Sequence, residues 1–526
     1  MVRKGLKYLA TCFGALVGIV VILGMLAAGA AIVYESSVTP NFVNEKIELD
    51  NRLAIPPLLE STEENGTQVF SLTLQKGDTE IFKGVQTETW GANGTYLMPT
   101  IRVRKGDNVE MHVTNELGQM TTIHWHGMHL PAAKDGVHQI IDSGETWEPD
   151  WEIRQQAATL WYHPHLMGKT GEHVYNGLAG MFILEDANSE NLDIPKEYGV
   201  DDIPFIIQDR EFDSEGQLIY RSNDSDTYGP TGMLGNTILV NGTYAPYVDV
   251  PAGMIRLRIL NGSNARRYNF GFDDNRTFYQ IASDGGFLEH PVPRTRMTLA
   301  VAERAEILVD MSDLEPVTLM SYEIDEGKPV IRSFIERVLQ SDRDTNEMFK
   351  IVELRPQKTA KARSPIPERL NTIQRFEEAE AAKTRTFVLG QSSINNKKME
   401  IDRVDEIVLV GTKEIWEITN PSAQHHPFHV HDVQFQILDR NGKPPPAYEQ
   451  GWKDTVHVAE DETVRVMMEF KDYTDPHVSY MFHCHMLEHE DHGMMGQYVV
   501  VDDLSQEVKI HSPLLDLHEM PETHSE

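Results

Sequence analysis

Histidines recur at four places in the chain as pairs separated by a single residue. The pairs are His124/His126, His163/His165, His429/His431 and His483/His485. Residues i and i+2 of a β-strand point to the same face, so each pair on a strand can direct two imidazoles into one site. With 22 histidines in 526 residues, four such pairs exceed what chance would supply. Eight imidazoles suit a cluster of several borderline metal ions, and imidazole is a good ligand for copper.

One of the two cysteines lies inside the last pair. On a strand, His483 and His485 face one side and the Cys484 sulfur faces the other, so Cys484 can bind a separate metal while its neighbours bind the cluster. Further candidate ligands are His426, His489 and Met494. Two histidines, one cysteine and a weak axial methionine are the ligand set of a blue-copper electron-transfer site. Zinc is the alternative metal, but closed structural zinc sites usually draw on cysteine-rich sets.

Three segments of the chain resemble one another and place these residues in related positions. They are 101–115, 248–261 and 407–420. Each predicts a strand, a glycine-containing turn and a second strand that ends in asparagine. A His-x-His pair begins nine residues after that asparagine in the first and third copies, whereas the second copy has Phe270 there. The repeat therefore predicts three related β-domains, with metal ligands only in the outer two.

The rest of the chain also reads as all-β, because short β-rich runs alternate with turns rich in Gly, Asn, Asp and Pro. The predicted β-domains cover 40–190, 195–350 and 375–505, with a linker at 351–374 and an acidic tail at 506–526. Helical periodicity within 370–382 predicts a helical linker into the third domain.

The first 35 residues are predicted to be a membrane segment. Arg3, Lys4 and Lys7 precede an uncharged stretch that exceeds the roughly 20 residues needed to span a bilayer. The leading basic residues orient the body outside the cytoplasm. An uncleaved anchor is favoured over a cleaved signal peptide, so we expect an extracytoplasmic protein, anchored at the cell surface or secreted if cleavage occurs. A net charge of -34 argues against a nucleic-acid partner.

The ligand motifs resemble those of the multicopper oxidases. The stretches that carry the resemblance are His124-Trp125-His126-Gly127, Trp161-Tyr162-His163-Pro164-His165, His426-Pro427-Phe428-His429-Val430-His431 and His483-Cys484-His485-Met486-Leu487-Glu488-His489. Two further runs, Ser283-Asp284-Gly285-Gly286 and Gly451-Trp452-Lys453-Asp454-Thr455, are similar to bacterial laccases and cuprous oxidases. The resemblance implies three cupredoxin domains, of the Greek-key barrel or sandwich type, and four copper ions.

It also implies a role for each ligand. The type 1 copper would be bound by Cys484, His426 and His489 with Met494 axial, the type 2 copper by His124 and His429, and the type 3 pair by His126, His163, His165, His431, His483 and His485. Single electrons would pass through Cys484 to the cluster, where dioxygen is reduced to water. That reduction consumes protons, and Asp135 and Glu490 match acidic positions credited in the family with proton delivery. Cys484, Asp135 and Glu490 are therefore the predicted catalytic residues.

The leading prediction is a laccase-like oxidase of phenols, aromatic amines or low-valent metal ions. Oxidation of cuprous ions for copper tolerance is an alternative. Related cuprous oxidases often carry a Met-rich insert and Asp or Met residues before the His-Pro-Phe-His motif, where this chain has Ser422-Ala423-Gln424. Copper storage, which would bind copper without turnover, is a further alternative. A non-catalytic copper-binding protein of the cell envelope belongs to another class, and loss of copper there should leave gaps in a ligand set that is complete here.

Overall fold

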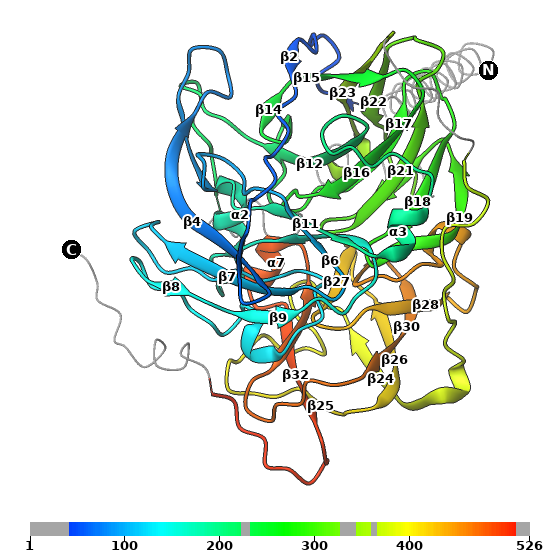
Figure 1. Cartoon of the computed structure of the whole chain (residues 1–526). Helices are drawn as coiled ribbons and strands as arrows, with labels where there is room; N and C mark the ends of the chain where they lie inside the picture. Colours follow the sequence, from blue (N-terminus) through cyan, green and yellow to red (C-terminus); the bar gives the residue numbers. More distant parts are fainter. Residues whose placement is uncertain (1–40, 222–231, 327–342, 359–365, 512–526) are drawn as a thin grey trace, which may run out of the picture. The chain divides into compact units, whose positions relative to one another are not determined.

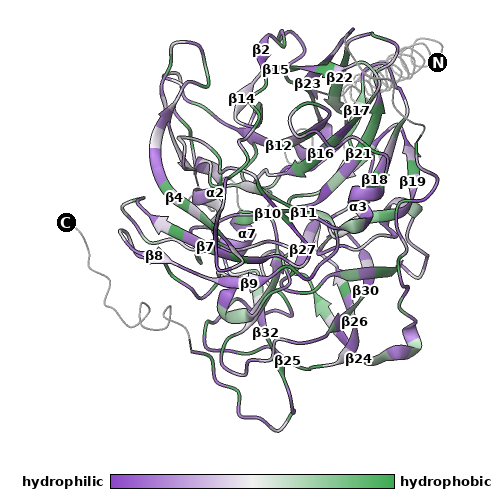
Figure 2. Ribbon diagram, viewed as in Figure 1, coloured by the Kyte–Doolittle hydropathy of each residue, from purple (hydrophilic) through white to green (hydrophobic). Residues whose placement is uncertain are grey.

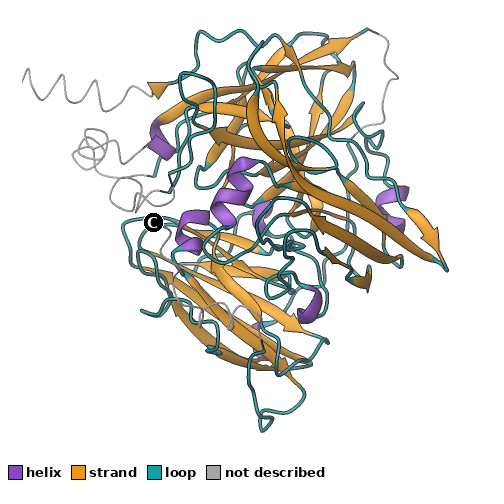
Figure 3. Ribbon diagram, turned by 90° about the vertical axis from the view of Figure 1, so that its left-hand side faces the viewer, coloured by secondary structure: helices purple, strands orange, loops and turns teal. Residues whose placement is uncertain are grey.

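The computed structural model describes residues 41–221, 232–326, 343–358 and 366–511. Strands dominate these residues and the helices among them are few and short (Figure 3), which confirms the all-β prediction. The predicted membrane segment and residues 512–526 of the predicted tail lie outside the described residues. None of the helices in the described ranges has both the length and the apolar character needed to cross a bilayer.

The described residues divide into two compact units. The smaller comprises 41–45, 322–326 and 343–349, and in it β1 (Asn41–Phe42) pairs in parallel with the start of β23 (Glu347–Gln357). Helix α6 (Arg343–Asn346) precedes that strand. The larger unit holds the other described residues and every candidate ligand.

Strands of the larger unit form three pairs of sheets, each pair drawn mainly from one successive part of the chain (Figure 1). The first pair contains β3 (Thr62–Glu64), β4 (Thr67–Thr79), β5 (Thr87–Ala92), β6 (Ile101–Arg104), β7 (Asn108–Asn115), β8 (Thr146–Trp147), β9 (Asp150–Glu152), β10 (Ala158–Tyr162) and β11 (Gly180–Glu185). The second contains β2 (Asn51–Arg52), β12 (Asp202–Arg210), β13 (Thr237–Val240), β14 (Thr243–Tyr244), β15 (Pro246–Pro251), β16 (Met254–Asn261), β17 (Tyr268–Phe272), β18 (Phe278–Ser283), β19 (Gly286–Arg294), β20 (Met297–Leu299), β21 (Arg304–Asp310), β22 (Val317–Ser321) and β23. The third contains β24 (Ala381–Val388), β25 (Glu406–Leu409), β26 (Thr412–Asn420), β27 (His426–Val430), β28 (Phe435–Arg440), β29 (Thr455–Val458), β30 (Glu462–Phe470), β31 (Tyr480–Cys484) and β32 (Met495–Val501).

Short helices connect some of these strands. They are α2 (Thr170–Asn176), α3 (Ala187–Asn191) and α7 (Leu487–Asp491), with the 3-10 turns η1 (Ala132–Lys134), η2 (Glu378–Glu380) and η3 (Ala447–Glu449).

The three predicted repeats form the strand–turn–strand units β6–β7, β15–β16 and β25–β26. In each unit the first strand pairs in parallel with the last strand of its part of the chain: β11, β23 or β32. The second pairs in parallel with an early strand, β4, β12 or β24. Burial alternates along β7, and Figure 2 shows hydrophobic and hydrophilic residues along single strands such as β4. The repeat therefore reflects one topology used three times.

A buried asparagine ends the second strand of each copy. Asn115, Asn261 and Asn420 are 0% exposed. Each side-chain amide donates to a backbone carbonyl four or five residues ahead and to at least one that is more distant. Each side-chain oxygen accepts from the backbone N–H two residues later. The asparagine thus fixes the turn that leads, in the outer copies, into a His-x-His pair.

We expect Asn261→Ala to lower the free energy of unfolding by about 3 kcal/mol, because it removes hydrogen bonds and leaves buried backbone groups without partners. Metal content should not change, since the side-chain hydrogen bonds of Asn261 go to backbone groups of the middle copy and not to a candidate ligand, Arg304 or Asp454. Denaturant unfolding with metal analysis of the folded protein tests this. The matched variant Asn115→Ala should lose metal as well, because Asn115 precedes His124. Unfolding of Asn261→Ala at the wild-type denaturant concentration would contradict the role of the asparagine.

The predicted helical linker at 370–382 was wrong. Residues 366 to 377 have no regular secondary structure, and the chain continues through η2 into β24. The Leu370 N–H donates to Glu289 O at 2.9 Å, and the Phe376 N–H donates to Gln436 Oε1 at 3.1 Å. These tertiary contacts outweigh the local periodicity. The domain boundaries themselves stay predictions, although β23 runs across the one placed after residue 350.

Candidate metal centres

Backbone pairing brings the four His-x-His pairs together two by two. In the third pair of sheets, β27 and β31 are antiparallel with His429 opposite His483. In the first part of the chain, His124 and His163 form an antiparallel bridge with N–O distances of 2.8 and 3.1 Å. Residues opposite one another on neighbouring strands have their side chains close together. Each outer part of the chain therefore supplies four adjacent imidazoles.

These eight imidazoles form one buried cluster. Ligand atoms lie within 4.8 Å of one another in three triads, His124/His429/His431, His126/His163/His485 and His165/His431/His483. In the last triad, the Nε2 atoms of His165 and His431 lie 3.2 and 3.1 Å from Nε2 of His483. Metal–imidazole bonds of about 2.0–2.1 Å around one ion separate ligand nitrogens by roughly this distance.

Most of the imidazoles donate a hydrogen bond from the ring nitrogen that does not face the cluster. Nδ1 donates to a backbone carbonyl in His124 (Asp135 O, 2.9 Å), His163 (Pro164 O, 2.8 Å) and His429 (Asp454 O, 2.8 Å). The Nε2 atoms of these three histidines are buried and have no hydrogen-bond partner among the described residues. A buried nitrogen without a partner is costly, and a ligand histidine commonly donates its other N–H in this way. The side chains present therefore fit a metal cluster.

His126 is turned the other way round. Its Nε2 lies 3.0 Å from Asp454 Oδ1, and its Nδ1 is buried without a hydrogen-bond partner in the described part of the chain. The nitrogen it offers to the cluster is therefore Nδ1. Asp454 lies in one of the family-like runs, but nothing in the sequence assigned it a role.

Five of the eight imidazoles of the cluster are held in the neutral form by their surroundings. Burial, followed by neighbouring imidazoles, lowers the pKa well below its usual value in His126, His163, His429, His431 and His485. Metal ligation needs neutral histidine, so this state is ready to bind an ion.

Both predicted proton donors lie against the cluster. Asp135 Oδ2 accepts from His431 Nδ1 at 2.7 Å. The Glu490 carboxylate lies 3.2 Å from His483 Nδ1 and 3.6 Å from His165 Nε2. Each acid therefore contacts a different part of the cluster.

Cys484 forms a second centre with His426 and His489. The Nδ1 atoms of the two histidines lie 3.4 and 3.6 Å from Cys484 Sγ. Met494 is buried in the same apolar core, and its carbonyl accepts from the Cys484 N–H at 3.1 Å. Burial raises the pKa of the Cys484 thiol, so a bound cation is what would hold it as a thiolate. The predicted alternation is confirmed, because His483 and His485 join the cluster while Cys484 joins this centre.

Ser422 is a contact of this centre that the sequence did not assign. Its Oγ lies 3.0 Å from His426 Nε2. Since His426 Nδ1 faces the sulfur, Nε2 carries the proton and donates to the serine. The Ser422 hydroxyl therefore fixes the orientation of the His426 ring, which lies between Cys484 and the segment before the His-Pro-Phe-His motif.

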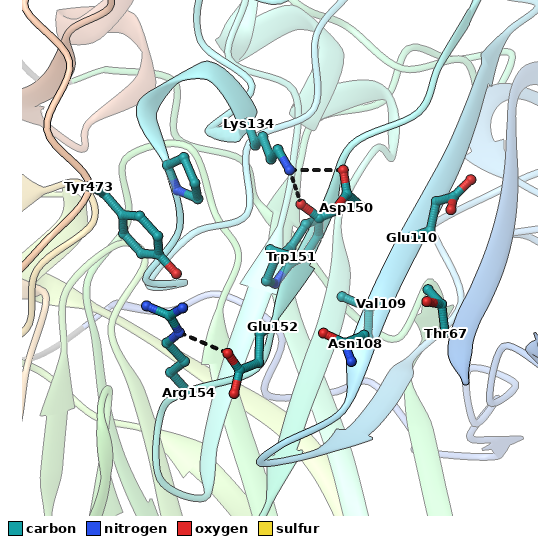
Figure 4. Close-up of a pocket in the computed structure, with 11 residues that line it drawn as sticks. Thr67, Asn108, Val109, Glu110, Lys134, Asp150, Trp151, Glu152, Arg154 and Tyr473 are labelled. Carbon is teal, nitrogen blue, oxygen red and sulfur yellow. Dashed lines mark hydrogen bonds and ion pairs between the residues drawn. The ribbon is translucent and has the colours of Figure 1, made fainter. Parts of the chain in front are cut away.

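Two pockets are lined by residues other than these ligands. The first, of about 330 Å³, is lined in part by His129 and Asp432. Burial lowers the pKa of His129, but the carboxylates of Asp432 and Asp472 raise it to about 10, so this histidine is a cation in an ion-paired network. The second, of about 300 Å³, is shown in Figure 4, where Lys134 and Arg154 are paired with Asp150 and Glu152. Neither lining contains a candidate ligand.

Comparison with known proteins agrees with this arrangement. Family profiles described as multicopper oxidase match residues 73–189 and 363–503. The chain is 36% identical to multicopper oxidase mco of Staphylococcus aureus over 458 residues, 86% of this chain and 92% of that protein. It is 39% identical to cell division protein FtsP of Sodalis glossinidius over 451 residues, 85% of this chain and 92% of that protein. A structure of the laccase-like multicopper oxidase CueO from Ochrobactrum sp. superposes with a TM-score of 0.77 at 35% identity, covering 85% of this chain and 100% of that one.

A cupredoxin-like fold with buried histidine and cysteine centres, matched at this identity over most of its length, places the chain in the multicopper oxidase family. Membership implies copper as the metal, and dioxygen and an electron donor as the reactants.

Proposed function

We propose that this protein is a laccase-like oxidase that takes single electrons from phenols, aromatic amines or low-valent metal ions and reduces dioxygen to water. The observation that carries the proposal is the junction at 483–485, where Cys484 belongs to one centre and both of its chain neighbours belong to the other. One covalent path of three residues then connects the site of donor oxidation with the site of oxygen reduction.

The proposed ligand sets follow the groups seen in the structure. His426, Cys484, His489 and Met494 would hold the type 1 ion, and His124 and His429 the type 2 ion. The triads His126/His163/His485 and His165/His431/His483 would each hold one type 3 ion. When bound, the four copper ions supply one-electron transfer at Cys484 and four-electron oxygen chemistry at the cluster.

The chain's own groups orient the ligands and handle protons. Carbonyls of Asp135, Pro164 and Asp454 fix the ring orientation of three cluster histidines. Asp135 Oδ2 and the Glu490 carboxylate are placed to hold protons next to His431 and His483 and to give them up as oxygen is reduced. The cluster histidines are at most 2% exposed, so bulk water is excluded from their surroundings.

Overall similarity does not separate the two classes of relative, because identity to mco and to FtsP is 36% and 39%. The ligand set favours the oxidase. All ten histidines, the cysteine and the methionine are present, and all twelve are buried. A copper-binding protein without turnover has no need of the acids placed against the cluster.

A donor panel on the copper-loaded protein tests the proposal. Phenols, aromatic amines, Cu(I), Fe(II) and Mn(II) are compared by oxygen uptake and by bleaching and recovery of the type 1 absorbance. We expect phenols or aromatic amines to sustain uptake with four electrons consumed per dioxygen. Copper binding without uptake for any donor would indicate storage, and Cu(I) turnover that equals or exceeds that of phenols would favour the cuprous alternative.

We further propose that the protein works outside the cytoplasm, attached through its N-terminal segment. The support is the order of basic and apolar residues at the start of the sequence. Fractionation of cells expressing the full chain, with protease added to intact cells or spheroplasts, is expected to show a membrane-bound and externally accessible body. Recovery in the cytoplasmic fraction would contradict this location.

A further inference from the structure

We propose that Arg304, which lies in the part of the chain without metal ligands, is a positioning residue for the histidine cluster. It acts through Asp454 to fix the ring orientation of His126, so that Nδ1 is the atom offered to the metal. This inference rests on the proposed copper cluster. It deepens that proposal by giving the middle pair of sheets a defined part in building the cluster.

The first support is a fully buried ion pair between two parts of the chain. Arg304 begins β21, and its guanidinium meets the Asp454 carboxylate with Nη1–Oδ1 and Nη2–Oδ2 distances of 2.7 and 2.6 Å. Both side chains are 0% exposed. Such two-point pairing fixes the plane of the carboxylate as well as its position.

The remaining donors of Arg304 are also used. Nε donates to Thr159 O at 3.0 Å, Nη1 to Ala302 O at 3.1 Å and Nη2 to Asp284 O at 3.1 Å. The guanidinium is therefore held by three backbone carbonyls and one carboxylate, and it presents a rigid surface to Asp454.

Asp454, held in place by Arg304, forms hydrogen bonds with two cluster histidines. Its Oδ1 lies 3.0 Å from His126 Nε2, and its backbone carbonyl accepts from His429 Nδ1 at 2.8 Å. A carboxylate oxygen is an acceptor, so His126 must carry its proton on Nε2. Nδ1 is then left with a lone pair, and it is the buried nitrogen without a partner among the described residues.

An independent support comes from Gly127, the residue after His126. Its φ is +82°, and a Cβ there would lie 2.5 Å from Asp454 Oδ2 and 3.0 Å from Arg304 Nη2. The space that a side chain would occupy is filled by the ion pair. The glycine of the first motif is thus required by the same contact that orients His126.

The test compares Arg304→Lys with Arg258→Lys in the full-length holoprotein. Lysine keeps the charge but cannot form the two-point contact. Arg258 is a matched control, because it is also buried in the middle part of the chain and pairs with Asp202 and Glu306 at 2.8 to 3.0 Å, away from Asp454. Both variants lose a buried two-point or bridged contact, so both should lose stability.

We expect only Arg304→Lys to weaken the retention of cluster copper against a chelator, by about ten- to a hundred-fold, as changes behind a metal ligand usually do. The type 1 absorbance should persist, since the Cys484 centre does not contact Arg304. Wild-type copper retention in Arg304→Lys, or equal loss in Arg258→Lys, would overturn the inference.

A second readout needs no copper. Histidine ring ¹⁵N signals of the metal-free protein, assigned with His126→Gln, are expected to show His126 protonated on Nε2 in the wild type and mixed between the two nitrogens in Arg304→Lys. An unchanged His126 signal would overturn the inference whether or not copper binds. Failure of the proposed function would instead appear in the wild type, as absence of bound copper or of oxygen uptake.

Discussion

Replacing Cys484 with serine is expected to lower the oxidation of every donor by at least about a thousand-fold, equivalent to roughly 4 kcal/mol of activation free energy. Cys484 belongs to the second centre, with His426 and His489, whereas its chain neighbours His483 and His485 belong to the histidine cluster. A serine hydroxyl is a poor ligand for copper and removes the sulfur from the electron path. Steady-state oxygen uptake with a phenol and with an aromatic amine measures the loss.

The variant also separates the two centres. Serine is close in size to cysteine, and the imidazoles of His483 and His485 are left in place, so we expect loss of the type 1 ion with retention of the cluster ions. Metal analysis and electron paramagnetic resonance of the type 2 signal check this. Residual turnover above about a tenth of the wild type, less than 1.4 kcal/mol of barrier, would mean that electrons reach the cluster by another route.

Replacing Glu490 with glutamine is expected to slow steady-state turnover by about a hundred-fold, the lower part of the range typical for a positioned acid. The carboxylate lies 3.2 Å from His483 Nδ1, and the amide that replaces it cannot take up and release a proton. Reduction of the type 1 site by donor in the absence of oxygen should keep its wild-type rate, because that step needs no proton at the cluster. Stopped-flow reduction and reoxidation measure the two halves separately.

Glu488 supplies a matched control two residues earlier in α7. It is also buried, but its carboxylate accepts from the Met233 N–H and from Asn264 Nδ2 at 3.0 and 2.9 Å rather than facing the cluster. We expect Glu488→Gln to reduce stability while reoxidation by oxygen stays fast. Equal slowing of reoxidation in both variants would show that burial of charge in α7, and not proton delivery by Glu490, governs the step.

Residues whose role follows from strand geometry alone could be predicted from the sequence. Alternation along a strand predicted that Cys484 and its neighbours serve different centres, and the repeated asparagines predicted three related strand–turn–strand units. The role of those asparagines could not be predicted, because their partners include carbonyls such as Leu299 O, 38 residues away from Asn261.

Contacts between distant segments explain what the sequence missed. Arg304 and Asp454 are separated by 150 positions. The residues around a buried arginine in a strand do not indicate which distant carboxylate it will pair with. The orientation of His126 depends on that partner. The helical linker was wrongly predicted for the same reason, since local periodicity cannot indicate the hydrogen bonds that tie the segment to Glu289 and Gln436.

The pairing of β27 with β31 has a consequence for how the protein matures. The two strands align His429 with His483 and Phe428 with Cys484, so a single register places ligands for both centres. A slip of one residue reverses the face of every side chain on a strand. It would bury His483 and His485 in the apolar core and turn Cys484 toward the cluster. With the proposed copper assignment, misaligned molecules would lose the type 1 absorbance and the activity together. The type 1 absorbance per protein would then measure the fraction of correctly folded chains.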